Sequence, residues 1–122
     1  MSISNIKKAY IDNIKNLAEN YKSISEIIVF GSTVEPDRCK ESSDIDIAII
    51  FNKNKSSIIK SKSYDTFLRK IYSYDLNQDY DILEFNSREE IESQGPLGKE
   101  ILKNGITIFK RDVQWLYVKS SS

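Results

Sequence analysis

The sequence predicts an α/β domain in which a small mixed β-sheet is packed with helices. Segments with apolar residues at helical spacing alternate along the chain with short runs rich in β-branched residues, and this alternation is typical of α/β folds. The chain has 122 residues, which is enough for one hydrophobic core and too few for two. We therefore expect a single domain over residues 1–112 and a C-terminal tail over residues 113–122.

The first part of the chain contains one predicted helix and two predicted strands. Apolar residues recur every three or four positions over residues 3–22, which indicates a helix. The run SEIIVFG at residues 25–31 is rich in β-branched residues and ends in glycine, so it predicts a strand. Residues 32–43 are polar and contain a proline, as in a loop, with room for a helical turn at the start. The run DIDIAIIF at residues 44–51 predicts the second strand.

The second part of the chain adds further helices and strands. Residues 52–57 are polar and predict a loop, and residues 58–75 carry apolar side chains at helical spacing. DYDILEF at residues 79–85 and ITIFK at residues 106–110 predict the third and fourth strands.

A helix that is interrupted once is predicted between these two strands. Ser87 can cap its N-terminus, and Glu90, three residues later, fits the capping-box pattern. The pair Gly95–Pro96 is expected to break the helix into two pieces. Gly105 is expected to end it.

Composition excludes several classes of site. The 18 basic residues balance the 18 acidic residues, so there is no broad basic surface for nucleic acid. The sequence contains no histidine, which excludes serine–histidine–aspartate triads and zinc sites with histidine ligands. Cys39 is the single cysteine, so an internal disulfide cannot form. No signal peptide or apolar run of membrane-spanning length is present, and we expect a cytoplasmic protein without a membrane partner.

Two aspartates stand at the head of the second strand. Side chains alternate along a strand, so Asp44 and Asp46 point to the same face, with Cα atoms roughly 7 Å apart. The isoleucines between and after them occupy the opposite face and anchor the strand in the core. The two carboxylates could simply be solvated. Alternatively they share a divalent cation, since Mg²⁺ prefers one or two carboxylates together with substrate phosphates.

A third acid, Asp81, lies inside the third predicted strand. An acidic residue in a short apolar strand is costly unless it is paired or liganded. If this strand neighbours the second one, three carboxylates converge at one end of the sheet, a constellation that suits two-metal phosphoryl transfer. Asp79 has the same parity but lies at the strand entry, where we expect it to be solvated. Glu84 points to the other face and is a weaker candidate.

Gly31 and Ser32 follow the first strand directly. A glycine at this place allows the backbone to approach a ligand closely and exposes N–H groups. If Ser32 begins a helical turn, the N–H groups of that turn favour a phosphate. A Gly-Ser pair after a strand is by itself only a turn, and its value comes from the strand before it and the aspartate pair after it.

Together these residues resemble the nucleotidyltransferase superfamily, whose fold resembles the palm of polymerase beta. The superfamily signature is an apolar-Gly-Ser element, a loop of about ten residues and Asp-x-Asp; here FGS is followed by eleven residues and then DID. YDIL supplies the third carboxylate, and PLGKEILKNGITIFK is similar to the end of small family members. The resemblance covers residues 4–110.

The minimal nucleotidyltransferases, which are often paired with a HEPN-domain protein in toxin–antitoxin modules, are the group that this chain resembles most. The resemblance implies a two-metal Mg²⁺ site and transfer of a nucleoside monophosphate, commonly AMP from ATP, to a hydroxyl group. The acceptor can be a tyrosine of the partner toxin. Carried onto this sequence, Gly31 and Ser32 would hold the triphosphate, Asp44, Asp46 and Asp81 would ligate the metals, and Asp81 would help to deprotonate the acceptor.

One departure from the family pattern concerns the loop after Gly-Ser. Many small members have a basic residue directly after Gly-Ser, whereas here the basic residues come late, as Arg38 and Lys40, among acidic neighbours. We expect both to be solvated.

Two other readings stay open at this point. The chain could be a binding module or antitoxin subunit with weak or no catalysis, anchored to a partner through WLYV at residues 115–118, although we expect that segment to cover its own sheet. An aminoglycoside-type enzyme would need a second domain or a dimer, and the sequence leaves a homo-oligomer open.

Overall fold

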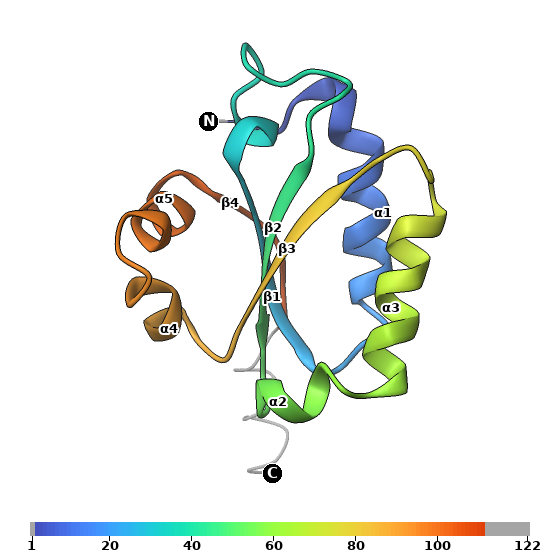
Figure 1. Cartoon of the computed structure of the whole chain (residues 1–122), viewed down its shortest axis with the longest axis vertical. Coiled ribbons are helices and arrows are strands. Elements are labelled where there is room, and N and C mark those ends of the chain that lie inside the picture. Colours follow the sequence, from blue (N-terminus) through green and yellow to red (C-terminus); the bar gives the residue numbers. More distant parts are fainter. Residues whose placement is uncertain (1, 112–122) are drawn as a thin grey trace, which may run out of the picture.

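A four-stranded mixed sheet forms the centre of the molecule (Figure 1). The computed structural model describes residues 2–111. Strands follow the order β3-β2-β1-β4 across the sheet. β1 is antiparallel to both of its neighbours, and β2 and β3 are parallel. The strands are β1 (Ile24–Phe30), β2 (Ile45–Phe51), β3 (Tyr80–Phe85) and β4 (Ile106–Lys110). The predicted fold class is therefore confirmed.

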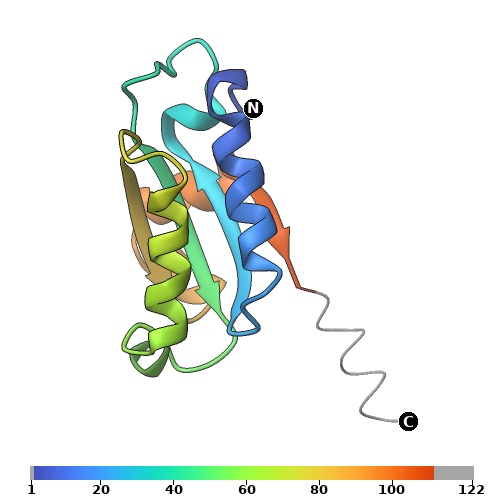
Figure 2. The same ribbon diagram turned by 90° about the vertical axis from the view of Figure 1, so that its right-hand side faces the viewer.

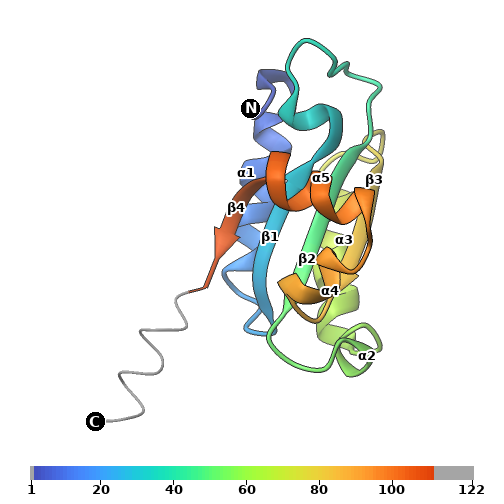
Figure 3. The same ribbon diagram turned by 90° about the vertical axis from the view of Figure 1, so that its left-hand side faces the viewer.

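Helices cover both faces of the sheet, as Figures 1, 2 and 3 show from three sides. Two longer helices lie on one face, and two shorter ones lie on the other. Two 3-10 turns and one short helix complete the domain. On the first face are α1 (Lys8–Ala18) and α3 (Lys62–Ser73), and on the second are α4 (Arg88–Glu92) and α5 (Pro96–Asn104). The turns are η1 (Asn5–Lys7) and η2 (Gly31–Val34), and the short helix is α2 (Lys55–Ile58).

The alternation of side chains along β2 decides which face each residue meets. Ile45, Ile47 and Ile49 join the core cluster beneath α1 and α3. Ala48 and Ile50 join the second cluster, beneath α4 and α5. Because helices bury both faces, a central strand must be apolar almost throughout, and a charged residue is kept near its end or where a partner pairs with it, as Arg88 does with Glu26 of β1.

The predicted elements differ from the observed ones mainly at helix starts. The helix expected over residues 3–22 begins with η1 and ends at Ala18. The loop expected over residues 52–57 contains the start of α2, where the Asn54 side chain accepts a hydrogen bond from the Ser56 amide at 2.8 Å. The helix expected from residue 58 starts only after Ser61, which caps α3. Polar residues cap α2 and α3, and apolar periodicity does not register these caps, whereas neither η1 nor α1 has a side-chain cap.

The interrupted helix before β4 is confirmed. Ser87 caps α4 and accepts a hydrogen bond from the Glu90 amide at 3.2 Å. The Glu90 carboxylate accepts from the amide of Asn86 instead of completing the box at Ser87. Gly95, with a φ of +66°, separates α4 from α5, which ends at Gly105.

Residues 113–122, including the WLYV segment, lie outside the described residues. Within residues 2–111, no helix has both the length and the apolar character that a bilayer crossing requires.

Candidate active site

Asp46 and Asp81 lie side by side on parallel strands. The register of β2 against β3 pairs the Cα atom of Asp46 with that of Asp81. Neighbouring strands are about 4.8 Å apart. Asp46 lies two residues before Ala48 on β2, and Asp81 lies two residues before Leu83 on β3. Ala48 and Leu83 belong to the cluster beneath α4 and α5, so both carboxylates face that side of the sheet. The second and third strands are therefore neighbours, which was the condition for the three carboxylates to converge.

Gly31 brings the turn after β1 against the Asp46 carboxylate. Phe30, the last residue of β1, pairs with Asp46 across the antiparallel ladder. Gly31 has a φ of +72°, and a Cβ atom added to it would lie 2.2 Å from Oδ2 of Asp46. Only glycine allows both this backbone conformation and this close approach. The Gly-Ser element and the aspartates therefore meet at one end of the sheet.

The turn expected at Ser32 is also present. Residues Gly31–Val34 form η2, whose position is held by a hydrogen bond of 2.8 Å from the Ser4 amide to the Thr33 carbonyl. The hydroxyl of Thr33 is buried and has no hydrogen-bond partner among the described residues. Ser32 itself is partly exposed at the surface of the turn.

Negative charge accumulates around Asp46. Burial, followed by the charges of Asp81, Asp44 and Glu100, raises its pKa to about 6. Asp44 is exposed and directly precedes β2, and Glu100 is an exposed residue of α5, which contacts both β1 and η2. The acidic groups that shift this pKa thus include the other two predicted carboxylates, Asp44 and Asp81. Glu100 is a fourth acid that the sequence analysis missed, because helical periodicity gives no sign of which strand end a helix covers.

The predicted carboxylates are not arranged as a complete set of metal ligands in this structure. Among the side chains of residues 2–111, no group of three or more acids or cysteines is arranged to hold a metal ion. The register brings Asp46 and Asp81 together, and Asp44 lies two residues before Asp46, directly before β2. Like charges that share one site repel each other, and a cation is the partner that offsets this repulsion.

Glu84 points away from this site, as predicted. It lies on β3 beneath α3, where it accepts a hydrogen bond from the Tyr64 hydroxyl. Burial and this hydrogen bond raise the pKa of Tyr64. Asp79 precedes β3 and is exposed, also as predicted.

The basic residues of the loop after η2 are solvated. Arg38 is exposed and forms an ion pair of 3.2 Å with Glu35 of the same loop. Lys40 is exposed as well. In this arrangement Arg38 contacts its own loop, and an ion pair this exposed contributes little to stability.

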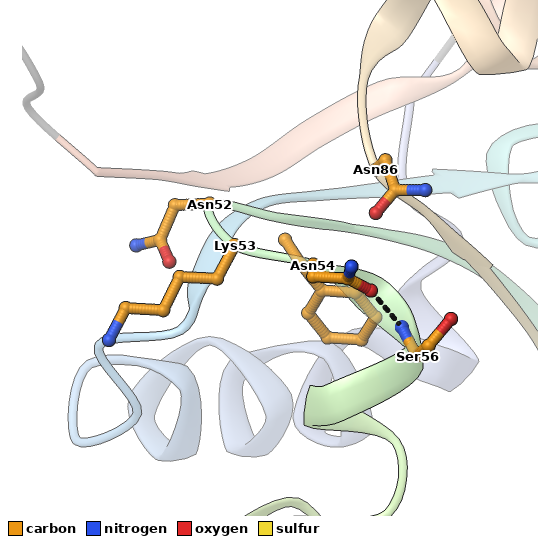
Figure 4. A pocket seen from close by; sticks show the side chains of 6 residues that line it. Asn52, Lys53, Asn54, Ser56 and Asn86 are labelled. Atoms are coloured by element: carbon orange, nitrogen blue, oxygen red, sulfur yellow. Dashed lines mark hydrogen bonds between the residues drawn. The ribbon is translucent and has the colours of Figure 1, made fainter.

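An open hollow of about 620 Å³ lies at the opposite end of the sheet (Figure 4). Asparagine, lysine and serine side chains surround it, and no carboxylate lines it. None of the predicted site residues lines this hollow. Its labelled lining residues are Asn52, Lys53, Asn54, Ser56 and Asn86.

Comparison with known proteins gives a family and a set of similar folds. A model of the family described as "Polymerase beta, Nucleotidyltransferase" matches residues 12–114. No curated protein sequence gives a significant match.

Three similar solved structures come from toxin–antitoxin complexes. One is a tri-AMPylated HEPN toxin of Shewanella oneidensis in complex with MNT antitoxin, with a TM-score of 0.52 and 18% identity over 94% of this chain and 83% of that one. A second, a mutant of the MntA-HpeT toxin-antitoxin, has a TM-score of 0.53 and 20% identity over 96% and 84%. A third, a toxin-antitoxin with AMP-PNP, has a TM-score of 0.55 and 19% identity over 91% and 83%. At these identities the similarity concerns the fold.

Proposed function

The chain belongs to the polymerase beta nucleotidyltransferase family, and from this premise we propose that it transfers AMP from ATP to a hydroxyl group in a Mg²⁺-dependent reaction. The observation that carries the proposal is the pairing of Asp46 with Asp81 beside the Gly31 turn. A reaction that uses ATP and Mg²⁺ fits the cytoplasm, which we propose as its location.

The acidic residues fit a divalent metal. Mg²⁺ prefers carboxylate oxygens and substrate phosphates over a complete protein cage. Each group that raises the pKa of Asp46 through its charge is itself negative, so the cluster contains negative charge that a cation would offset. Asp44, Asp46 and Asp81 would hold two Mg²⁺ ions, which when bound would neutralise charge on the triphosphate and on the pyrophosphate that leaves.

Gly31 and Ser32 would hold the triphosphate. The absent side chain of Gly31 lets the Asp46 carboxylate lie against the backbone of η2, so a triphosphate held by this turn would lie next to the proposed metal ligands. The amide and hydroxyl groups of Ser32 are hydrogen-bond donors at the same place. The backbone of this turn would thus supply contacts that the paired Arg38 does not.

Asp81 would act as the general base. It is exposed, so an acceptor hydroxyl can approach it from solvent. The acceptor oxygen forms a bond to the α-phosphorus of ATP, and the bond from that phosphorus to the bridging oxygen of the β-phosphate breaks. Pyrophosphate leaves, and the hydroxyl proton passes to the Asp81 carboxylate and then to water.

The proposed acceptor is a hydroxyl of a HEPN-domain protein, such as a tyrosine, with this chain as the antitoxin. Support comes from the similar fold of an antitoxin bound to a tri-AMPylated HEPN toxin and of a toxin–antitoxin with AMP-PNP.

A second candidate function is an antitoxin that acts by binding alone. It is favoured by the similar fold of proteins solved in complexes of a toxin with its antitoxin. The two functions share a partner and differ in whether AMP is transferred.

Labelled ATP distinguishes them. We would incubate the protein with Mg²⁺, α-labelled ATP and a co-expressed HEPN-domain partner, and measure label on the partner. Transfer that is lost with Asp44→Asn and Asp46→Asn but kept with Asp79→Asn supports the enzyme. Label transfer that survives Asp44→Asn and Asp46→Asn rules out these residues as metal ligands. Neutralisation of the toxin without any label transfer favours the binding function.

A further inference from the structure

Lys7 is a buried cation close to the candidate active site. It is the last residue of η1, and only 1% of its surface is exposed. Lysine is almost never this buried unless it is paired with an acid. However, none of the four ion pairs in the described part of the chain includes Lys7. Because burial of a charge is costly, the contacts that Lys7 makes instead need an explanation.

The ammonium group of Lys7 donates to neutral oxygens on two separate segments. Its Nζ lies 2.6 Å from Oε1 of Gln78, which precedes β3, and 2.9 Å from the carbonyl oxygen of Glu41, in the loop before β2. Nζ also lies over the ring of Tyr10, 5.8 Å from its centroid. Tyr10 is fixed in turn by a hydrogen bond of 2.5 Å to Asp75.

Gln78 connects Lys7 to the backbone that leads into β2 and into β3. Its side chain is buried, and Nε2 donates to the carbonyl oxygens of Ser43 at 3.1 Å and Asp79 at 2.7 Å. The Asp79 carbonyl also accepts from the Ile45 amide at 3.1 Å. These bonds hold the residue directly before Asp44 against the segment that leads into Asp81.

We propose that Lys7, acting through Gln78, is a positioning residue that fixes the loop carrying Asp44 relative to the strand carrying Asp81. This inference rests on the proposed function, because the positioned groups are the proposed metal ligands. The ammonium group has two hydrogen bonds to neutral acceptors and none to an acid among the described residues, and its charge adds to the Tyr10 hydrogen bond in lowering the pKa of Asp75. The two hydrogen bonds are what connect it to the loop. Removal of either partner leaves a buried polar group unpaired and releases the loop.

Manganese binding tests the proposal with the full-length protein. Mn²⁺ affinity, measured from the electron paramagnetic resonance signal of free Mn²⁺, is compared between wild type, Lys7→Met and Lys8→Met. Lys8 is exposed, so its substitution is a matched control for loss of one positive charge. We expect Lys7→Met to weaken Mn²⁺ binding by about tenfold, the lower end of the loss seen when a residue that orients a metal ligand is removed, and Lys8→Met to leave it unchanged. Equal affinities in folded Lys7→Met and Lys8→Met would overturn the proposal.

A second variant covers the case in which Lys7→Met does not fold. Gln78→Glu keeps an acceptor for Lys7 but loses both N–H donors to Ser43 and Asp79. Its additional negative charge would by itself attract Mn²⁺, so weaker Mn²⁺ binding in Gln78→Glu supports the positioning role. Unchanged or tighter binding contradicts it.

Amide exchange separates failure of this inference from failure of the proposed function. If wild type binds no Mn²⁺, the proposed metal site fails, and hydrogen exchange of the Ile45 amide then decides the positioning role. We expect this amide to exchange about tenfold faster in Lys7→Met, or in Gln78→Glu, than in Lys8→Met. Equal exchange rates would show that neither Lys7 nor Gln78 holds the loop.

Discussion

Asp46 of β2 and Asp81 of β3 occupy paired positions on adjacent parallel strands, although 35 residues separate them in the sequence. The side chains on either side of them along the strands are apolar and buried or half-buried. Their pairing therefore places two like charges at the rim of a hydrophobic core. This relationship gives the candidate site its main chemical property, which is negative charge that a cation can offset.

The two acids at the start of the third strand should differ in their effect on catalysis. Asp81→Asn should lower the rate of AMP transfer by about 100-fold or more, because it removes the proposed general base. Asp79→Asn should retain the wild-type rate, since Asp79 lies outside β3 and is solvated. Initial rates of label transfer from ATP measure both. Equal losses in the two variants would contradict the assignment of Asp81.

The raised pKa of Asp46 predicts that folding stability without metal falls as the pH rises. The folded state holds this proton with a pKa of about 6, against the ordinary value of 3.8, so over this window the folded state binds more protons than the unfolded state. Stability therefore declines from about pH 4 to pH 6, and the loss is fully present at neutral pH. Asp46→Asn should stabilise the metal-free protein at pH 7.5 by about 1–2 kcal/mol, a value reduced to allow for solvent screening of a half-buried group.

Urea unfolding at pH 4 and pH 7.5 in a chelator measures this difference. The gain from Asp46→Asn should vanish near pH 4, where the wild-type carboxyl is protonated. A gain that is the same at both pH values would show that the substitution acts through packing and not through charge.

Substrate and metal together should stabilise the wild type selectively. A ligand that binds only the folded state at 100 times its dissociation constant adds about 2.7 kcal/mol. Mg²⁺ with a non-hydrolysable ATP analogue should therefore raise the melting temperature of wild type and leave that of Asp46→Asn almost unchanged. The same shift in both proteins would place nucleotide binding elsewhere.

Gly31 should tolerate substitution less well than Gly95, although both have positive φ. Gly31→Ala meets the Asp46 carboxylate at 2.2 Å, whereas a Cβ atom at Gly95 meets nothing within 4 Å. Gly95→Ala should cost about 1–2 kcal/mol from the left-handed backbone alone. Gly31→Ala should cost more and also abolish transfer. Chemical denaturation and label transfer measure both effects, and an active Gly31→Ala variant would contradict the close packing of this turn.

The ion pair between Arg88 and Glu26 should contribute to stability but not to catalysis. Glu26 is 7% exposed and accepts two hydrogen bonds from Arg88, at 2.9 Å and 3.2 Å. Arg88→Met leaves a buried carboxylate unpaired and should destabilise the protein by about 1–3 kcal/mol. Arg69→Met, which breaks an exposed ion pair to Asp65, is the matched control and should change little. Equal urea midpoints for the two variants would contradict a structural role for Glu26.

Local sequence features were sufficient for most of the elements. β4 was predicted at its observed bounds, and the other three strands were predicted to within one residue at each end. The caps at Ser87 and Gly105 were also predicted. Periodicity, β-branching and turn chemistry act over a few residues, so a single sequence contains them directly.

Other features depended on contacts between distant segments. Nothing in the sequence pattern distinguishes Lys7 from its neighbour Lys8, yet Lys7 is buried and Lys8 is exposed. Glu100 was missed for a similar reason, because its relation to Asp46 depends on where α5 crosses the sheet.

By itself the sequence determined that Asp44 and Asp46 share one face at the head of an apolar strand, because side-chain direction alternates along any strand. Only the tertiary structure decided that Asp81 stands next to Asp46, that Gly31 closes against the Asp46 carboxylate and that Lys7 is buried against Gln78 and the loop before β2. The physical reason is that strand order and register are chosen by burying both faces of the sheet at once, a condition that no local segment contains.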